Sequence, residues 1–319
     1  MTPLIRTSAD YGSIVLPTRD DVERARTTIG NRLPRTPLLS SRTIGARLKC
    51  ELFQRTGSFK VRGALNKLSS MSDEEKQRGV IAISAGNHAQ AVAFAAREEG
   101  IDALVVMWQG ASSQKIEATR GYGATVDLEA TDPGGAFARL AELQEQTGRT
   151  LLHPFDDPLV IAGAGTVGLE IEEDAPDADV VIVPVGGGGL ISGIQTALGD
   201  RMRVVAVEPD TSTALHTAIE RGEPTPVTPT SIADGLNAPF AGALPLEIAG
   251  GLERLLVSEE EIEAAFRLLY ERAKLACEPA GAVATAAWLS GRIDAERPVV
   301  LVSGGNVATE TAAAILARR

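Results

Sequence analysis

The 319-residue sequence predicts an α/β protein built on two open, parallel β-sheets. Short runs rich in Val and Ile alternate with amphipathic stretches of helical length, and Gly or Pro marks most of the junctions between them. The runs are almost continuously apolar, which is typical of strands covered by helices on both faces. Strands that alternate with helices in this way form parallel sheets through crossover connections.

Strands and helices are expected in the following order. The strands are predicted at residues 80–84, 103–107, 124–128, 179–185, 203–208 and 298–303. The helices are predicted at residues 87–100, 134–148 and 258–276. The first three strands fall within residues 72–151, which predicts a small domain. Residues 1–71 and 152–319 are expected to form a larger domain that carries the main ligand site.

Composition excludes several classes of protein. The net charge of −11 opposes binding to nucleic acid, whose phosphates would be repelled. Cys50 and Cys277 have no disulfide-framework or CxxC spacing, which favours an intracellular protein. His88, His153 and His216 are not spaced as metal ligands, so no metal site is predicted. The sequence shows no signal peptide and no membrane-spanning run, and we expect a cytoplasmic protein.

A run of four glycines is the first motif that suggests chemistry. Gly186, Gly187, Gly188 and Gly189 follow an apolar strand and precede a helix that is expected to begin near Leu190. Without side chains, the backbone N–H groups can converge on an anion, and the start of the helix adds partial positive charge. A mobile loop is the simpler interpretation, but the position between a buried strand and a helix favours a phosphate site.

The same loop also resembles a dinucleotide-binding fingerprint. Gly187, Gly189 and Gly193 have the spacing GxGxxxG rather than GxGxxG, and Glu208 ends the next strand. A nicotinamide-dependent oxidoreductase is therefore an alternative. It leaves Lys60 and two further loops without a function.

Those two loops also follow predicted strands. Ser84 ends one strand, and Asn87 and His88 then open a helix whose first N–H groups could bind a carboxylate. Ser303 ends the last strand and is followed by Gly304 and other short residues, so its hydroxyl could contact a ligand. Helix capping alone would explain either loop.

Lys60 lies between a Thr-Gly-Ser turn and a predicted helix, next to Phe59. Burial disfavours the ammonium form of such a lysine, and a neutral amine is a nucleophile for aldehydes. A ligand that carries both a phosphate and an aldehyde is pyridoxal 5′-phosphate (PLP). The lysine, the glycine loop and the two polar loops together therefore predict a PLP site.

From about residue 18 onward the sequence resembles the threonine dehydratase and serine racemase group of fold-type II PLP enzymes, whose fold is like that of the tryptophan synthase β-chain. Four ordered motifs carry the resemblance: LKCELFQRTGSFKVRGA (48–64), SAGNHAQ (84–90), PVGGGGLISG (184–193) and SGGN (303–306). The stretches RTPL, HPFDDP, IADGL and EPAGA agree as well. The resemblance implies that the cofactor lies in the cleft between two lobes and is bound mainly by the larger one. It also implies that the small domain, residues 72–151, is mobile.

The resemblance also implies residue roles. Lys60 would be the catalytic residue and carry the cofactor. Ser84, Ala85, Asn87 and His88 would form the loop around the substrate carboxylate. The remaining cofactor contacts would come from the following residues: Phe59, Asn87, Gly186, Gly187, Gly188, Gly189, Leu190, Gly235, Glu278 and Ser303.

The implied activity is a threonine or serine ammonia-lyase that acts on a small amino acid. Racemases of this group resemble SSGNH where this chain has SAGNH, and Ala85 has no proton to transfer, so a dehydratase is favoured. A serine racemase, or a lyase for 3-hydroxyaspartate or phenylserine, stays an alternative. Relatives imply a homo-oligomer, a dimer or tetramer. We expect no effector domain, because the chain ends soon after its last predicted helix.

Overall fold

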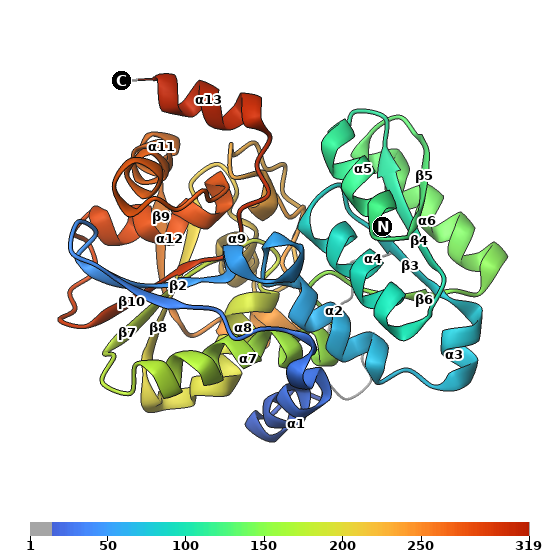
Figure 1. Cartoon of the computed structure of the whole chain (residues 1–319), viewed down its shortest axis with the longest axis horizontal. Helices are drawn as coiled ribbons and strands as arrows, with labels where there is room; N and C mark the ends of the chain where they lie inside the picture. Colours follow the sequence, from blue (N-terminus) through green and yellow to red (C-terminus); the bar gives the residue numbers. More distant parts are fainter. Residues whose placement is uncertain (1–14, 319) are drawn as a thin grey trace.

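The computed structural model describes residues 15–318, which fold around two β-sheets that lie side by side (Figure 1). The larger sheet has six strands in the order β1-β2-β10-β7-β8-β9, and the smaller has four in the order β5-β4-β3-β6. All neighbouring strands are parallel except β1 and β2, which are antiparallel. The predicted α/β class with parallel sheets is therefore confirmed, with one antiparallel edge strand that the sequence did not predict.

The strands have these bounds: β1 Leu38–Ser41, β2 Ala46–Cys50, β3 Val80–Ile83, β4 Ala103–Trp108, β5 Thr125–Ala130, β6 Thr150–Leu151, β7 Val180–Pro184, β8 Arg203–Pro209, β9 Glu253–Val257 and β10 Pro298–Val302. All six predicted strands are present. They are β3, β4, β5, β7, β8 and β10, and the residues of β3, β7 and β10 are buried throughout. This burial on both faces explains their unbroken apolar sequences.

The α-helices have these bounds: α1 Arg19–Ile29, α2 Lys60–Ser69, α3 Asp73–Arg78, α4 Asn87–Glu99, α5 Ser113–Gly121, α6 Pro133–Thr147, α7 Pro158–Asp174, α8 Gly189–Leu198, α9 Ala214–Arg221, α10 Ala243–Ala249, α11 Glu259–Leu268, α12 Pro279–Leu289 and α13 Thr309–Ala317. The helix predicted at 258–276 is wrong in its second half. There α11 passes into a short π-helical segment, Leu269–Ala273, which ends at Lys274 with a positive φ of 60°.

Helix α2 lies between the two sheets and packs against both α4 and α7 (Figure 1). Its inner face is buried, and Arg62 forms ion pairs with Glu51 after β2 and with Glu170 on α7. Buried charges of this kind are tolerated only when they are paired and hydrogen-bonded. The cluster therefore fixes the start of α2, where Lys60 is the first helical residue.

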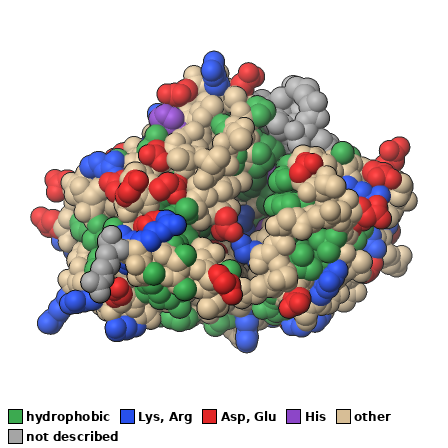
Figure 2. All heavy atoms as spheres, turned by 90° about the horizontal axis from the view of Figure 1, so that it is seen from above, with side chains coloured by type: hydrophobic (Ala, Val, Ile, Leu, Met, Phe, Trp, Pro, Cys, Tyr) green, Lys and Arg blue, Asp and Glu red, His purple; other side chains and the backbone are tan. Residues whose placement is uncertain are grey.

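In the part of the chain that the structure describes, the strands of the smaller sheet all lie within residues 80–151. Phe155 and Phe240 pack into the apolar cluster under this sheet, together with Ile83 and Val106. The surface is hollowed between the two halves of the molecule (Figure 2). The exact domain boundaries and the mobility of residues 72–151 stay predictions.

Candidate active site

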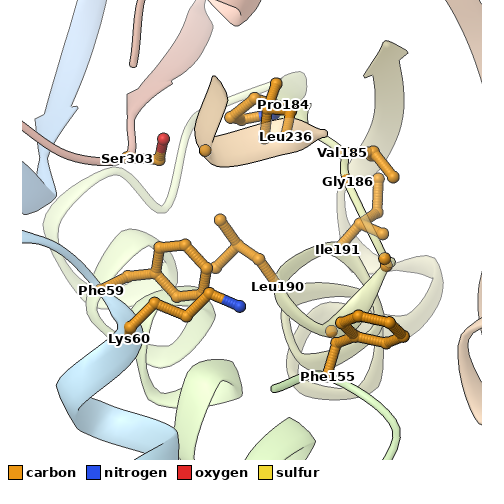
Figure 3. Close-up of a pocket in the computed structure, with 14 residues that line it drawn as sticks. Phe59, Lys60, Phe155, Pro184, Val185, Gly186, Leu190, Ile191, Leu236 and Ser303 are labelled. Atoms are coloured by element: carbon orange, nitrogen blue, oxygen red, sulfur yellow. The ribbon is translucent and has the colours of Figure 1, made fainter. Parts of the chain in front are cut away.

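Lys60 projects from the start of α2 into a pocket at the carboxyl ends of the strands of the larger sheet (Figure 3). Its Nζ donates a hydrogen bond to the carbonyl oxygen of Pro154 at 2.8 Å and lies 5.3 Å from the centre of the Phe59 ring. Burial lowers the pKa of this amine from 10.5 to about 8. The lowered pKa increases the fraction of neutral amine near pH 7, and the neutral form is the one that a nucleophile or base requires.

The glycine loop forms the opposite wall of the pocket (Figure 3). Helix α8 begins at Gly189, and Gly188 before it has a φ of 94° that favours glycine. A Cβ on Gly187 would lie 2.3 Å from the Phe155 ring, so this glycine is required for close packing. The first N–H groups of α8 have no partner within the helix and form an anion-binding end at the pocket.

Ser303 follows β10 and lines the same pocket (Figure 3). The next helix, α13, begins only at Thr309, so capping does not explain this serine. The carbonyl oxygen of Ser303 accepts a hydrogen bond from the Phe59 N–H at 3.2 Å. This bond holds the residue before the lysine against the end of the last strand.

Asn87, Glu278 and Gly235 form a second group beside the pocket. The Asn87 Nδ2 atom donates to Glu278 Oε1 at 2.7 Å, and a Cβ on Gly235 would lie within 4 Å of both of these atoms. Burial, and after it the negative charge of Asp234, raise the pKa of Glu278 to about 7. Asn87 is the first residue of α4, but its side chain makes these tertiary contacts instead of capping the helix.

The loop predicted to hold a carboxylate spans Ser84 to His88, between β3 and the first turn of α4. The Ser84 hydroxyl accepts a hydrogen bond from the Gly86 N–H at 3.1 Å, and Ala85 is half-buried beside it. The ring of His88 is buried, and its Nε2 contacts the Leu152 carbonyl oxygen at 3.0 Å. Burial and the nearby charge of Lys60 lower the pKa of His88 to about 3, so the ring is neutral. The His88 ring therefore brings no positive charge to a substrate carboxylate.

Glu208 does not fit the nicotinamide alternative. Its carboxylate is buried at the end of β8, where one oxygen accepts from the Leu215 N–H and the other from the His216 N–H, both at 2.8 Å. An acid that binds a ribose must turn an oxygen to the ligand. Here both oxygens bind the first turn of α9.

The model of the family described as "Pyridoxal-phosphate dependent enzyme" matches residues 31–305. The chain belongs to this family. Its members bind PLP, and in the fold-type II architecture described above the chain is therefore a PLP-dependent enzyme. The resemblance drawn from the four motifs is confirmed.

Individual relatives are similar in sequence or structure over nearly the whole chain. The catabolic L-threonine dehydratase of Escherichia coli K12 is 43% identical over 304 residues, covering 90% of this chain and 92% of that protein. The L-threonine ammonia-lyase of Thermotoga maritima is also 43% identical, covering 91% of this chain and 76% of that protein. Among solved structures, maize serine racemase is similar with a TM-score of 0.88 at 35% identity, covering 93% of this chain and 96% of that one. The threonine deaminase of T.th. has a TM-score of 0.86 at 39% identity, covering 92% of this chain and 99% of that one.

The residues around the pocket fit PLP. Three groups line one pocket: the Lys60 amine with its lowered pKa, the start of α8 and the neutral hydroxyl of Ser303. The amine suits an aldehyde, the helix start suits a phosphate, and the hydroxyl suits a pyridine nitrogen. The glycine loop leaves the helix start free of side chains. Lys60, Gly186 to Leu190, and Ser303 would hold the cofactor.

Three contributors were not predicted from the sequence. Pro154 supplies the carbonyl that receives Lys60, and Phe155 packs against the glycine loop. Asn306 bonds to Asn87. Pro154 and Phe155 lie in the HPFDDP stretch and Asn306 in SGGN, so the sequence signal for all three is the motif that contains them.

Proposed function

We propose that the chain is a threonine/serine ammonia-lyase that converts a β-hydroxy α-amino acid to a 2-oxo acid and ammonia. The observation that carries the proposal is the Lys60 amine, with its pKa near 8, in one pocket with the neutral Ser303. The relatives that are 43% identical are named for the same reaction class.

The residues of the chain have defined tasks in this reaction. The N–H groups at the start of α4, after Ser84 and Ala85, would bind the substrate carboxylate. Asn87 would contact the phenolic oxygen of the bound cofactor. Bound PLP supplies the electron sink for the bond that breaks at the α-carbon. The neutral Lys60 amine accepts the α-proton. Ser303 does not enforce a protonated pyridine nitrogen as a carboxylate would, which favours loss of the β-hydroxyl as water over transamination.

The remaining expectations are proposals too. Within residues 15–318 there is no helix of the length and apolar character needed to cross a bilayer. We propose a cytoplasmic enzyme, in which Cys50 and Cys277 are free, buried thiols. We also propose a homo-oligomer that acts on a small amino acid.

A substrate panel tests the proposal directly. The holoenzyme is incubated with L-threonine, L-serine, 3-hydroxyaspartate and phenylserine, and 2-oxo acid formation is measured with Lys60→Ala as the control. We expect L-threonine to give 2-oxobutanoate and the control to give none. A fully loaded enzyme that forms no 2-oxo acid from any of the four would contradict the proposal.

Serine racemase activity is the second candidate, because maize serine racemase has a similar structure. Ala85 lacks the hydroxyl that would carry a proton on the opposite face of the substrate. We expect Ala85→Ser to raise the rate at which L-serine is converted to D-serine, as measured by chiral chromatography. An unchanged rate would mean that position 85 does not carry this proton.

A further inference from the structure

Two loops that are far apart in the sequence pair beside the lysine. Ser58 and Gly304 form an isolated antiparallel bridge, and the Gly305 N–H donates to the Gly57 carbonyl oxygen at 2.9 Å. Together with the bond from Phe59 to Ser303, this pairing fixes the loop before Lys60 against the loop after β10. Asn306 is the next residue along the second loop.

Asn306 packs over the Thr56–Gly57 turn. A Cβ on Gly57 would lie 2.5 Å from the Asn306 Oδ1 atom, so the amide rests directly on this glycine. Thr56 has a φ of 61°, which a β-branched residue adopts only when its surroundings hold it there. The Thr56 carbonyl oxygen accepts a hydrogen bond from Asn306 Nδ2 at 2.7 Å, and this contact stabilises the strained turn.

The donor and acceptor roles in the series of hydrogen bonds that starts at Thr56 can be assigned in only one way. A main-chain carbonyl can only accept, so the Asn306 atom that faces it must be the nitrogen. The same Nδ2 also donates to Asn87 Oδ1 at 2.8 Å. Asn87 must then turn its own nitrogen away from Asn306, and that nitrogen donates to the carboxylate of Glu278.

This direction matters for the ligand. The Asn87 nitrogen carries two hydrogens, and the bond to Glu278 uses one of them. The other can be donated to an oxygen in the pocket. If the amide were flipped, Asn87 would present an oxygen instead, which repels an anionic ligand oxygen.

We propose that Asn306 is a positioning residue that fixes the side-chain amide of Asn87 with its nitrogen toward the cofactor. The proposal rests on the contact between Asn87 and the phenolic oxygen of PLP that the proposed function includes. Asn306 touches neither cofactor nor substrate in this account. Its effect is transmitted through Asn87 alone.

The test compares Asn306→Ala and the milder Asn306→Ser with Asn66→Ala. Asn66 is a matched control because it is also an asparagine whose Nδ2 donates to a main-chain carbonyl, that of Leu159 at 2.8 Å, but it lies away from the pocket. The absorption spectrum of each holoenzyme is titrated with pH. The ratio of its long-wavelength to its near-ultraviolet band reports the ionisation of the phenolic oxygen. PLP affinity and the melting temperature of the apoprotein are measured alongside.

We expect Asn306→Ala to lower the band ratio. It should also raise the dissociation constant of PLP by about tenfold, which is the effect of one lost hydrogen bond. Asn306→Ser should give a smaller change in the same direction. Asn66→Ala should lower the melting temperature without changing the band ratio. In an Asn87→Ala background, Asn306→Ala should change the band ratio no further, because the two residues act as one unit.

An unchanged band ratio in both Asn306 variants overturns the proposal. So does an equal change in Asn66→Ala, which would point to general destabilisation, or a full additional change in the Asn87→Ala background. The spectra need only bound cofactor. A protein with these spectral changes and no lyase activity would therefore contradict the proposed function while supporting the role of Asn306.

Discussion

Lys60 is half-buried at the start of a helix, and among residues 15–318 the hydrogen-bond partner of its amine is an uncharged carbonyl, that of Pro154. Because no anion stabilises its ammonium form there, burial lowers its pKa to about 8. The rate of covalent PLP incorporation into the apoprotein should therefore rise with pH up to about 8 and then level off, which stopped-flow absorbance can follow. A rate that keeps rising toward pH 10.5 would indicate an ordinary exposed lysine.

Single residues could be predicted from the sequence where the chemistry of one side chain is distinctive. A lysine beside a glycine turn and a serine at a strand end indicate a site from the sequence alone. The roles of Pro154 and Asn306 could not be predicted in this way. Pro154 acts through its main-chain oxygen, and Asn306 acts through a partner 219 residues away.

Strands with unbroken apolar sequences could be predicted, whereas burial alone was not sufficient. The fully buried β7 and β10 have unbroken apolar sequences and were found. Strand β2, with the sequence ARLKC, contains Lys49, which is completely buried and paired with Glu170. Strand β9, ERLLV, lies at the sheet edge with its first residues exposed. Charged residues interrupt the apolar pattern of both strands, and the partners of these charges are known only from the folded structure.

The glycine loop depends on close packing as well as on phosphate binding. In Gly187→Ala the added methyl group would overlap the Phe155 ring, and overpacking of this kind costs about 1–3 kcal/mol. We expect a lower free energy of unfolding in urea and weaker PLP binding. Gly251→Ala is the control, because its Cβ would meet nothing within 4 Å and it precedes β9, away from the pocket. Equal effects of the two substitutions would contradict this account of the loop.

Helix α2 is held in place by the buried ion pairs of Arg62. In Arg62→Met the carboxylate of Glu51, which is fully buried, would lose its guanidinium partner, and we expect a loss of about 3–5 kcal/mol in the free energy of unfolding. Arg35→Met is the matched control. It removes exposed pairs with Glu173 and Asp174 and should cost less than about 1 kcal/mol. Urea denaturation of the apoproteins measures both, and similar losses would show that burial of the pair is unimportant.

At the scale of the whole molecule, an ion pair joins the two lobes at the pocket. Lys115 on α5, beside the smaller sheet, bonds to Asp234, the neighbour of Gly235. Both charges act on Glu278. After burial, which is the largest cause of its raised pKa, the negative charge of Asp234 raises the pKa of Glu278 further and the positive charge of Lys115 lowers it.

The two partners should therefore shift this pKa in opposite directions. Asp234→Asn removes a negative charge and should lower the pKa of Glu278 below its value of about 7, whereas Lys115→Met should raise it. The pH dependence of the PLP absorbance measures both. Asp177→Asn is the control, since Asp177 is also ion-paired and has 57% of its side chain exposed, against 56% for Asp234, but it pairs with Arg47 on β2.

The same variants test whether the small lobe moves. If the small lobe opens, the ion pair between Lys115 and Asp234 breaks, and Lys115 no longer lowers the pKa of Glu278. The difference in the pKa of Glu278 between the two variants therefore reports how closed the cleft is. Saturating glycine supplies the amine and carboxylate of a substrate without a β-hydroxyl, and we expect it to close the cleft and widen the difference in pKa between Lys115→Met and Asp234→Asn. A difference that glycine leaves unchanged would mean that the lobes keep one arrangement, and the predicted mobility of residues 72–151 would be wrong.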